Sequence, residues 1–119
     1  MLRTVVTVAT GLCLASTLAG AQEQAPNRRE FTIVAKDHTF TPNTLAVSQD
    51  DLVKITLTSE DRPSSFAIDA YRIVKRAAGG FSTTFEFRAD KAGTFIFYCN
   101  LTADEGCKEM KGTLVVKAK

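Results

Sequence analysis

The sequence predicts an all-β sandwich, and three observations lead to that prediction. Apolar and polar residues alternate with a period of two in several short runs, which is the pattern of strands with one buried face. Turns rich in Gly, Pro, Asn and Asp separate these runs. The chain has 119 residues, which is enough for one hydrophobic core but not for two. Many short strands punctuated in this way are typical of a sandwich or barrel.

The first 21 residues have the features of a secretory signal peptide. Arg3 is the only charged residue before Glu23, and the apolar stretch between them ends in small residues up to Ala21. A charged start, a short apolar run and an Ala-x-Ala end define such a signal. The alternative is an uncleaved membrane anchor. The Thr, Ser and Gly residues in the run argue against this alternative, because they make the run less apolar than a typical membrane span. We expect cleavage after Ala21, a periplasmic or secreted protein, and no stable membrane span after cleavage.

Cleavage would divide the chain into three parts. Residues 1–21 are the signal peptide, residues 22–29 are a polar, flexible leader, and residues 30–119 are the folded domain. Cys13 is lost with the signal, so the mature protein keeps Cys99 and Cys107. Export places these two cysteines where disulfides form and persist.

Five groups of alternating residues mark strands in the folded domain. In each group one parity is apolar and points inward, and the other faces water or a second layer. The apolar positions are Phe31 and Ile33; Val53, Ile55 and Leu57; Phe81, Phe85 and Phe87; Phe95, Phe97 and Cys99; and Leu114 and Val116. Residues 69–78 lack clean alternation, and a helical turn is expected there. Eight Phe and no Trp suit a compact core filled by rings.

Composition argues against two classes of function. The chain carries 15 Lys and Arg against 13 Asp and Glu, so there is no electrostatic case for binding nucleic acid. His38 is the only histidine, and no nucleophile or orienting carboxylate accompanies it in a pattern typical of a catalytic triad. We therefore expect a protein that is not an enzyme, with His38 as a surface or hydrogen-bonded imidazole.

The most informative segment gathers three sulfur-containing residues on one loop. The predicted strand from Phe95 ends at Cys99, a polar stretch follows, and Cys107 and Met110 come just before the last strand. Thiolate and thioether are soft ligands that suit Cu(I). A loop held at both ends by strands can preorganise such a site.

This segment resembles the copper loop of cupredoxins. That loop has the form Tyr-Cys, a spacer, Gly-His, two residues, Met, then Gly and an apolar strand, and here it reads from Tyr98 to Val116. Residues 39–45 and 64–68 resemble the early Phe-x-Pro and His-Ser-Phe segments of the family. The similarity extends to small periplasmic cupredoxins and to the copper domain of cytochrome oxidase subunit II. It implies a cupredoxin-like Greek-key β-sandwich over about residues 31–116.

The resemblance also implies a ligand set, and two of its members are replaced. The family holds copper with two His, one Cys and a weaker Met. Cys99 and Met110 stand at the Cys and Met positions, whereas Cys107 and Ser64 stand at the two His positions. The dinuclear form needs a second Cys where Ala103 stands. Neither the trigonal blue-copper plane nor the two-copper site can be assembled from these residues.

Two functions remain open at this point. In the first, Cys99, Cys107 and Met110 hold Cu(I), with Ser64 as a poor fourth ligand, and the protein serves copper handling or electron transfer. Its partner would then be a periplasmic redox or copper-trafficking protein. In the second, a Cys99–Cys107 disulfide locks a metal-free structural or interaction domain. Because a neutral hydroxyl is a poor copper ligand, the expected role of Ser64 is instead a local backbone hydrogen bond after Pro63.

Overall fold

The computed structural model of the chain describes residues 27–119. The predicted signal peptide and all but the end of the predicted leader therefore lie outside the described residues. The first strand, β1 (Arg28–Lys36), begins two residues before the predicted start of the folded domain, so Arg28 and Arg29 belong to a strand and not to the leader. Over the described range, no helix is long and apolar enough to cross a membrane.

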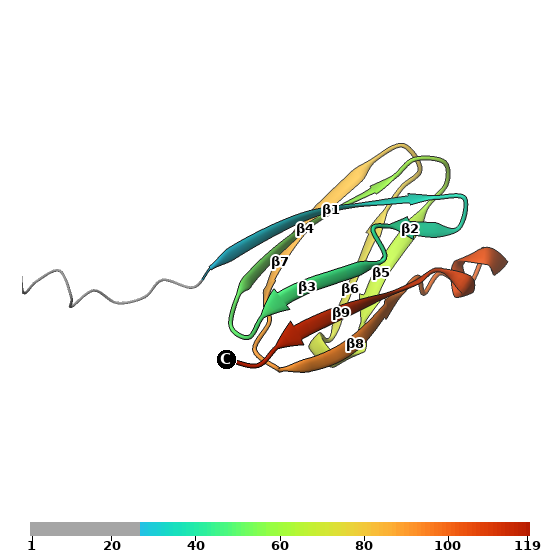
Figure 1. Ribbon diagram of the computed structural model, residues 1–119. Coiled ribbons are helices and arrows are strands. Elements are labelled where there is room, and N and C mark those ends of the chain that lie inside the picture. The colour runs from blue at the N-terminus through green and yellow to red at the C-terminus, as the bar shows by residue number, and fades with distance from the viewer. Residues whose placement is uncertain (1–26) are drawn as a thin grey trace, which may run out of the picture.

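Two mixed sheets pack face to face, which confirms the predicted all-β sandwich (Figure 1). One sheet has the order β2-β1-β4-β7, and the other has the order β3-β9-β8-β5-β6. Besides β1, the strands are β2 (Thr39–Thr41), β3 (Thr44–Ser48), β4 (Leu52–Ser59), β5 (Ser64–Ile68), β6 (Ile73–Ala77), β7 (Ser82–Arg88), β8 (Gly93–Tyr98) and β9 (Lys111–Lys117). The chain crosses between the sheets several times, so β1 and β4 pair in parallel, as do β3 and β9. These crossings give the Greek-key arrangement that was expected.

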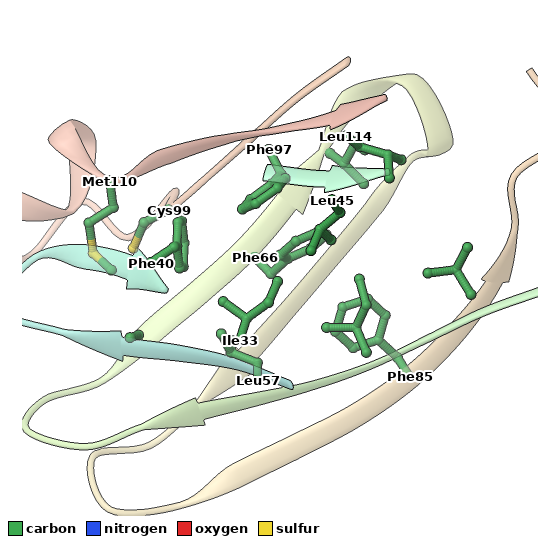
Figure 2. Packing of buried hydrophobic residues seen from close by; sticks show 14 of the residues in the cluster. Ile33, Phe40, Leu45, Leu57, Phe66, Phe85, Phe97, Cys99, Met110 and Leu114 are labelled. Atoms are coloured by element: carbon green, nitrogen blue, oxygen red, sulfur yellow. The ribbon is translucent and has the colours of Figure 1, made fainter. Parts of the chain in front are cut away.

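The alternating residues of the central strands build the core. In β4, Val53, Ile55 and Leu57 are all buried, and the residues between them are only partly buried. The core also contains a row of aromatic rings (Figure 2), in which Phe66 stacks on Phe97 with ring centroids 4.7 Å apart. Ring pairs of this kind add to the stabilisation from burial. Phe66 also packs against Phe85, which belongs to β7 in the other sheet, with ring centroids 5.3 Å apart. The core therefore joins both sheets through aromatic contacts.

One predicted core residue lies outside the core. Phe81 shares the parity of Phe85 and Phe87, but its side chain is 66% exposed. The reason is that β7 begins only at Ser82, so Phe81 belongs to the preceding turn and the alternation of the strand does not reach it. The prediction for Phe81 is wrong, and that for Phe85, which is buried, is confirmed.

The segment without alternation contains both a turn and a strand. A short 3₁₀ helix, η1 (Asp69–Tyr71), confirms the expected helical turn. It is followed by β6, which the sequence did not indicate. The strand β6 lies at the edge of its sheet and pairs only with β5, and its three central residues are exposed. An edge strand of this kind has no buried face to produce alternation.

Candidate functional site

The sulfur-containing loop lies at one end of the sandwich, between β8 and β9. It includes a second 3₁₀ helix, η2 (Glu105–Glu109), which projects beyond the sheets in Figure 1. The Cys99 N–H donates to the Met110 carbonyl over 3.1 Å, and this bond extends the β8–β9 pairing past the ends of both strands. Within the loop, the Met110 N–H donates to the Cys107 carbonyl over 3.0 Å. The backbone therefore fixes all three sulfur-containing residues relative to one another.

Cys99 and Cys107 form a disulfide. Their Cα atoms are 5.1 Å apart, which is within the usual range for this bond. Both residues belong to the core, with Cys99 3% and Cys107 0% exposed. Of the two states that the sequence left open, the structure has the oxidised one.

Met110 lies next to this disulfide. Its side chain is buried, and Figure 2 shows the side chains of Met110 and Cys99 extending in the same direction beside Phe40. The structure thus brings together the three sulfur-containing residues that the sequence singled out. Met110 also belongs to the hydrophobic core cluster, so it fills space as well as facing the sulfurs.

Two neighbouring serines face Cys99. Ser64, at the upstream His position, is buried, and its hydroxyl lies 3.9 Å from Cys99 Sγ rather than on the backbone partner that was expected. Ser65 lies closer, 3.6 Å from the same sulfur, but its hydroxyl also donates to Asn100 Oδ1 over 2.7 Å. Because a hydroxyl carries one hydrogen, the shorter bond to Asn100 takes it. The sequence reasoning did not identify Ser65 or Asn100.

Cys107 has a different polar neighbour. The backbone N–H of Leu101 donates to Cys107 Sγ over 3.1 Å. The backbone of the loop holds this N–H in place, and over the described part of the chain it has no other acceptor. The two sulfurs of the disulfide therefore differ, since only Cys107 receives a short, fixed hydrogen bond.

His38 contacts the loop that carries the disulfide through Asp104. Its Nε2 lies 2.9 and 3.0 Å from the two carboxylate oxygens of Asp104. Arg62 Nη1 lies 2.7 Å from the same Nε2 and 3.0 Å from Nδ1. Asp104 also caps η2 by accepting from the Gly106 N–H over 3.1 Å. The imidazole is hydrogen-bonded, as expected. The sequence did not indicate the contact between Asp104 and His38.

A hollow of about 390 Å³ opens beside the disulfide. Its lining residues are Tyr98, Cys99, Asn100, Leu101, Thr102 and Lys108. Cys99 is part of this lining and Cys107 is not. A second hollow of about 630 Å³ is lined by Arg62, Pro63, Arg76 and residues 101–105, so the two hollows share Leu101 and Thr102.

The donor set does not fit a blue-copper centre. The cysteine sulfurs are bonded to each other, Ser64 offers only a neutral hydroxyl, and the single histidine is turned to Asp104. Among residues 27–119 no group of three or more His, Cys, Asp or Glu side chains is placed to hold a metal ion. Three sulfurs would suit Cu(I), but only after the disulfide is reduced to two thiolates.

Comparison with known proteins identifies one family and several solved structures of similar fold. The family of cupredoxin-like domains matches residues 5–116. No curated protein matches the sequence. Among solved structures, auracyanin A, a "blue" copper protein from Chloroflexus aurantiacus, is similar at 18% identity with a TM-score of 0.66, covering 76% of this chain and 100% of that one.

Two larger enzymes contain the same fold. A heme-copper terminal oxidase is 18% identical with a TM-score of 0.65, and the match covers 75% of this chain and 65% of that chain. The copper nitrite reductase from Nitrosomonas europaea is 18% identical with a TM-score of 0.65, and the match covers 78% of this chain and 42% of that chain. At this level of identity the likeness concerns the fold.

Proposed function

Because the chain belongs to the family of cupredoxin-like domains, we propose that it is an exported, non-enzymatic member in which a disulfide replaces copper ligation. It acts as a metal-free structural or interaction domain and does not carry electrons through a blue-copper centre. The observation that supports this most directly is the bond between Cys99 and Cys107, at two positions that resemble the ligand positions of the family. Two sulfurs joined in this way are not thiolates and do not bind copper as thiolates do.

The disulfide holds the end of the sandwich in one conformation. It links the residue after β8 to the middle of η2, across a sequence separation of 8. In the chain-entropy account, closing a loop of this length stabilises the folded state by about 2–3 kcal/mol. The loop carries exposed charged residues of both signs, Glu105 and Lys108 among them. A fixed loop with such side chains can present a constant surface to a partner.

A second candidate function is copper handling by the reduced protein. It is favoured by the position of Met110, which is buried and backbone-paired to Cys99 over 3.1 Å. With the disulfide open, Cys99, Cys107 and Met110 would offer Cu(I) a soft three-sulfur site, and the bound copper would supply one-electron redox chemistry. The partner would then be a periplasmic redox or copper-trafficking protein.

One titration separates the two candidates. The mature protein is purified from an extracytoplasmic compartment, its free thiols are counted, and Cu(I) is titrated against a chelating competitor before and after reduction. The metal-free proposal expects no free thiols and no competitive binding in either state. Binding by the reduced protein that is lost in Cys107→Ser and weakened in Met110→Leu would overturn it in favour of copper handling. An intense visible band with Cu(II) would contradict the absence of a blue-copper centre.

A further inference from the structure

We propose that the Cys99–Cys107 disulfide is a site of thiol–disulfide exchange with a fixed direction of opening. An external thiolate attacks Cys99 Sγ, and Cys107 leaves as the thiolate. The two sulfurs lie in different surroundings, and each difference favours the same direction. This inference requires the disulfide of the proposed function but is independent of whether the reduced protein binds copper.

Access differs between the two sulfurs. Cys99 contributes to the lining of the hollow of about 390 Å³, so a small thiol that enters the hollow meets this residue. Cys107 is 0% exposed and is not part of that lining. Cys99 is itself 3% exposed, so only the side of this residue at the hollow can be reached. Because exchange requires direct contact between the attacking sulfur and the attacked one, Cys99 is the more accessible of the two targets.

The charge at the hollow favours an anionic attacker. Lys108 lines it, and the only ion pair of that ammonium over the described residues is with Glu105 at 3.9 Å. Both side chains of this pair are largely exposed, so the pair is weak and leaves the ammonium free to attract another anion. A thiolate approaching Cys99 therefore experiences a positive charge at the entrance.

The surroundings of Cys107 favour its departure as the thiolate. The Leu101 N–H lies 3.1 Å from Cys107 Sγ and stabilises negative charge there as the S–S bond breaks. Among residues 27–119, Cys99 has only a weaker donor, the Ser64 hydroxyl at 3.9 Å, because the Ser65 hydroxyl is committed to Asn100. The thiolate that forms at Cys107 is the better stabilised of the two, and a well-stabilised thiolate leaves faster.

The complete reaction balances with a dithiol as the reductant. The first thiolate forms a mixed disulfide with Cys99 and releases Cys107 as a thiolate. The second thiol of the reductant, once deprotonated, attacks its own sulfur in that mixed disulfide and releases Cys99 as a thiolate. Two electrons pass to the protein, the reductant ends as a disulfide, and its two thiol protons pass through solvent to the two cysteines. The partner class is therefore an extracytoplasmic dithiol protein.

The direction of opening can be read from which cysteine carries the adduct. Oxidised protein is treated briefly with 2-mercaptoethanesulfonate, quenched in acid, and alkylated with N-ethylmaleimide. Cleavage before Asp90 and Asp104 then places Cys99 and Cys107 on separate peptides. We expect the thiol adduct on residues 90–103 and the alkyl group on residues 104–119, in at least tenfold excess over the reverse. An equal or reversed distribution, or reaction only in denaturant, would overturn the proposal.

Two lysine variants test the role of charge at the hollow. Lys108→Gln should slow exchange with 2-mercaptoethanesulfonate about three- to fivefold, as expected for one charge a few ångströms away in water. Exchange with 2-mercaptoethanol should slow less, because its attacking thiolate carries one negative charge and not two. Lys111→Gln makes the same change in net charge at a lysine outside the hollow and is the matched control. Equal slowing by both variants would contradict the attack route. Free thiols counted before treatment would instead contradict the proposed function itself, so the two failures are distinguishable.

Discussion

The imidazole of His38 lies directly against Gly106, so that a methyl group added at Gly106 would overlap the ring. His38 comes from the turn between β1 and β2, where Asp37 and His38 both have positive φ angles, of 51° and 59°. That turn conformation directs the ring toward η2, where its Nε2 meets Asp104. The contact joins the first two strands to the loop that carries the disulfide.

Gly106→Ala should therefore displace His38 and loosen the loop. The φ angle of Gly106 is not in the left-handed region, so alanine is acceptable to the backbone and the cost arises from the clash with the ring. We expect the free energy of unfolding to fall by about 1–2 kcal/mol, as is typical of overpacking, measured by urea denaturation. In a His38→Ala background the same change should cost much less. Additive effects of the two changes would contradict a direct contact.

Phe66 is the central ring of the core, and its loss should be the most damaging of the aromatic substitutions. It is fully buried and contacts Phe97 and Phe85, with ring centroids 4.7 and 5.3 Å away. Phe66→Ala should lower the free energy of unfolding by about 3–5 kcal/mol. Phe81→Ser, at an exposed position, should change it by less than about 0.5 kcal/mol. A large effect at Phe81 in monomeric protein would mean that the ring packs against the sandwich.

The contrast between these two phenylalanines shows how far alternation predicts the fold. Alternation identified β4 because each inward residue is buried between the two sheets. It failed for Phe81 because the alternation of apolar and polar residues does not show where a strand begins, and β7 begins one residue later, at Ser82. It also failed for β6, whose three central residues are all exposed at a sheet edge, so that no alternation of apolar and polar residues appears. The fold class followed from the central strands, and the errors lie at the ends and edges.

The sequence predicted which residues form the candidate site, but not whether its two cysteines are thiols or a disulfide. The spacing of Cys99, Cys107 and Met110 between two strands was enough to predict that they come together. Whether two neighbouring cysteines are thiols or a disulfide depends on oxidation, which no residue pattern records. The contact between His38 and Asp104 joins residues 66 positions apart, and only the packed sandwich brings them together.

Tyr98 should titrate above the usual range of tyrosine, because its hydroxyl donates to Asp69 Oδ1 over 2.8 Å. This bond is the main reason that the pKa of Tyr98 is raised from its ordinary value of 10.0. The pKa of Tyr71 is also raised, chiefly by burial. In both cases the folded protein holds the phenolic proton more tightly than the unfolded chain does. Their stabilisation is therefore complete below about pH 10 and is lost as pH rises through the folded pKa values.

Alkaline absorbance titration of the two tyrosines checks this. In the native protein both should ionise above the tyrosines of the denatured chain. Tyr98→Phe should leave a single transition, that of Tyr71, and should reduce the loss of thermal stability above pH 10. A transition at the ordinary value in the native protein that disappears in this variant would show that the bond to Asp69 is not formed in solution.

Removal of the disulfide should loosen the loop without unfolding the sandwich. Cys99→Ala/Cys107→Ala eliminates the cross-link, and the chain-entropy account predicts a loss of about 2–3 kcal/mol in the free energy of unfolding. The aromatic core lies between the sheets and keeps its own contacts, such as that between Phe66 and Phe97. We therefore expect a cooperative transition at lower urea, with faster amide exchange concentrated in residues 99–110.

The reduced wild-type protein is the control for this variant, since it loses the cross-link but keeps both sulfur atoms in the core. Its stability should fall between those of the oxidised protein and the double alanine variant, because the alanines also remove buried sulfur contacts. If reduction leaves the urea midpoint unchanged, the disulfide does not constrain the native loop. A reduced protein that is more stable than the oxidised one would show that the dithiol is the preferred native state, and the copper-handling candidate would then be favoured over the metal-free one.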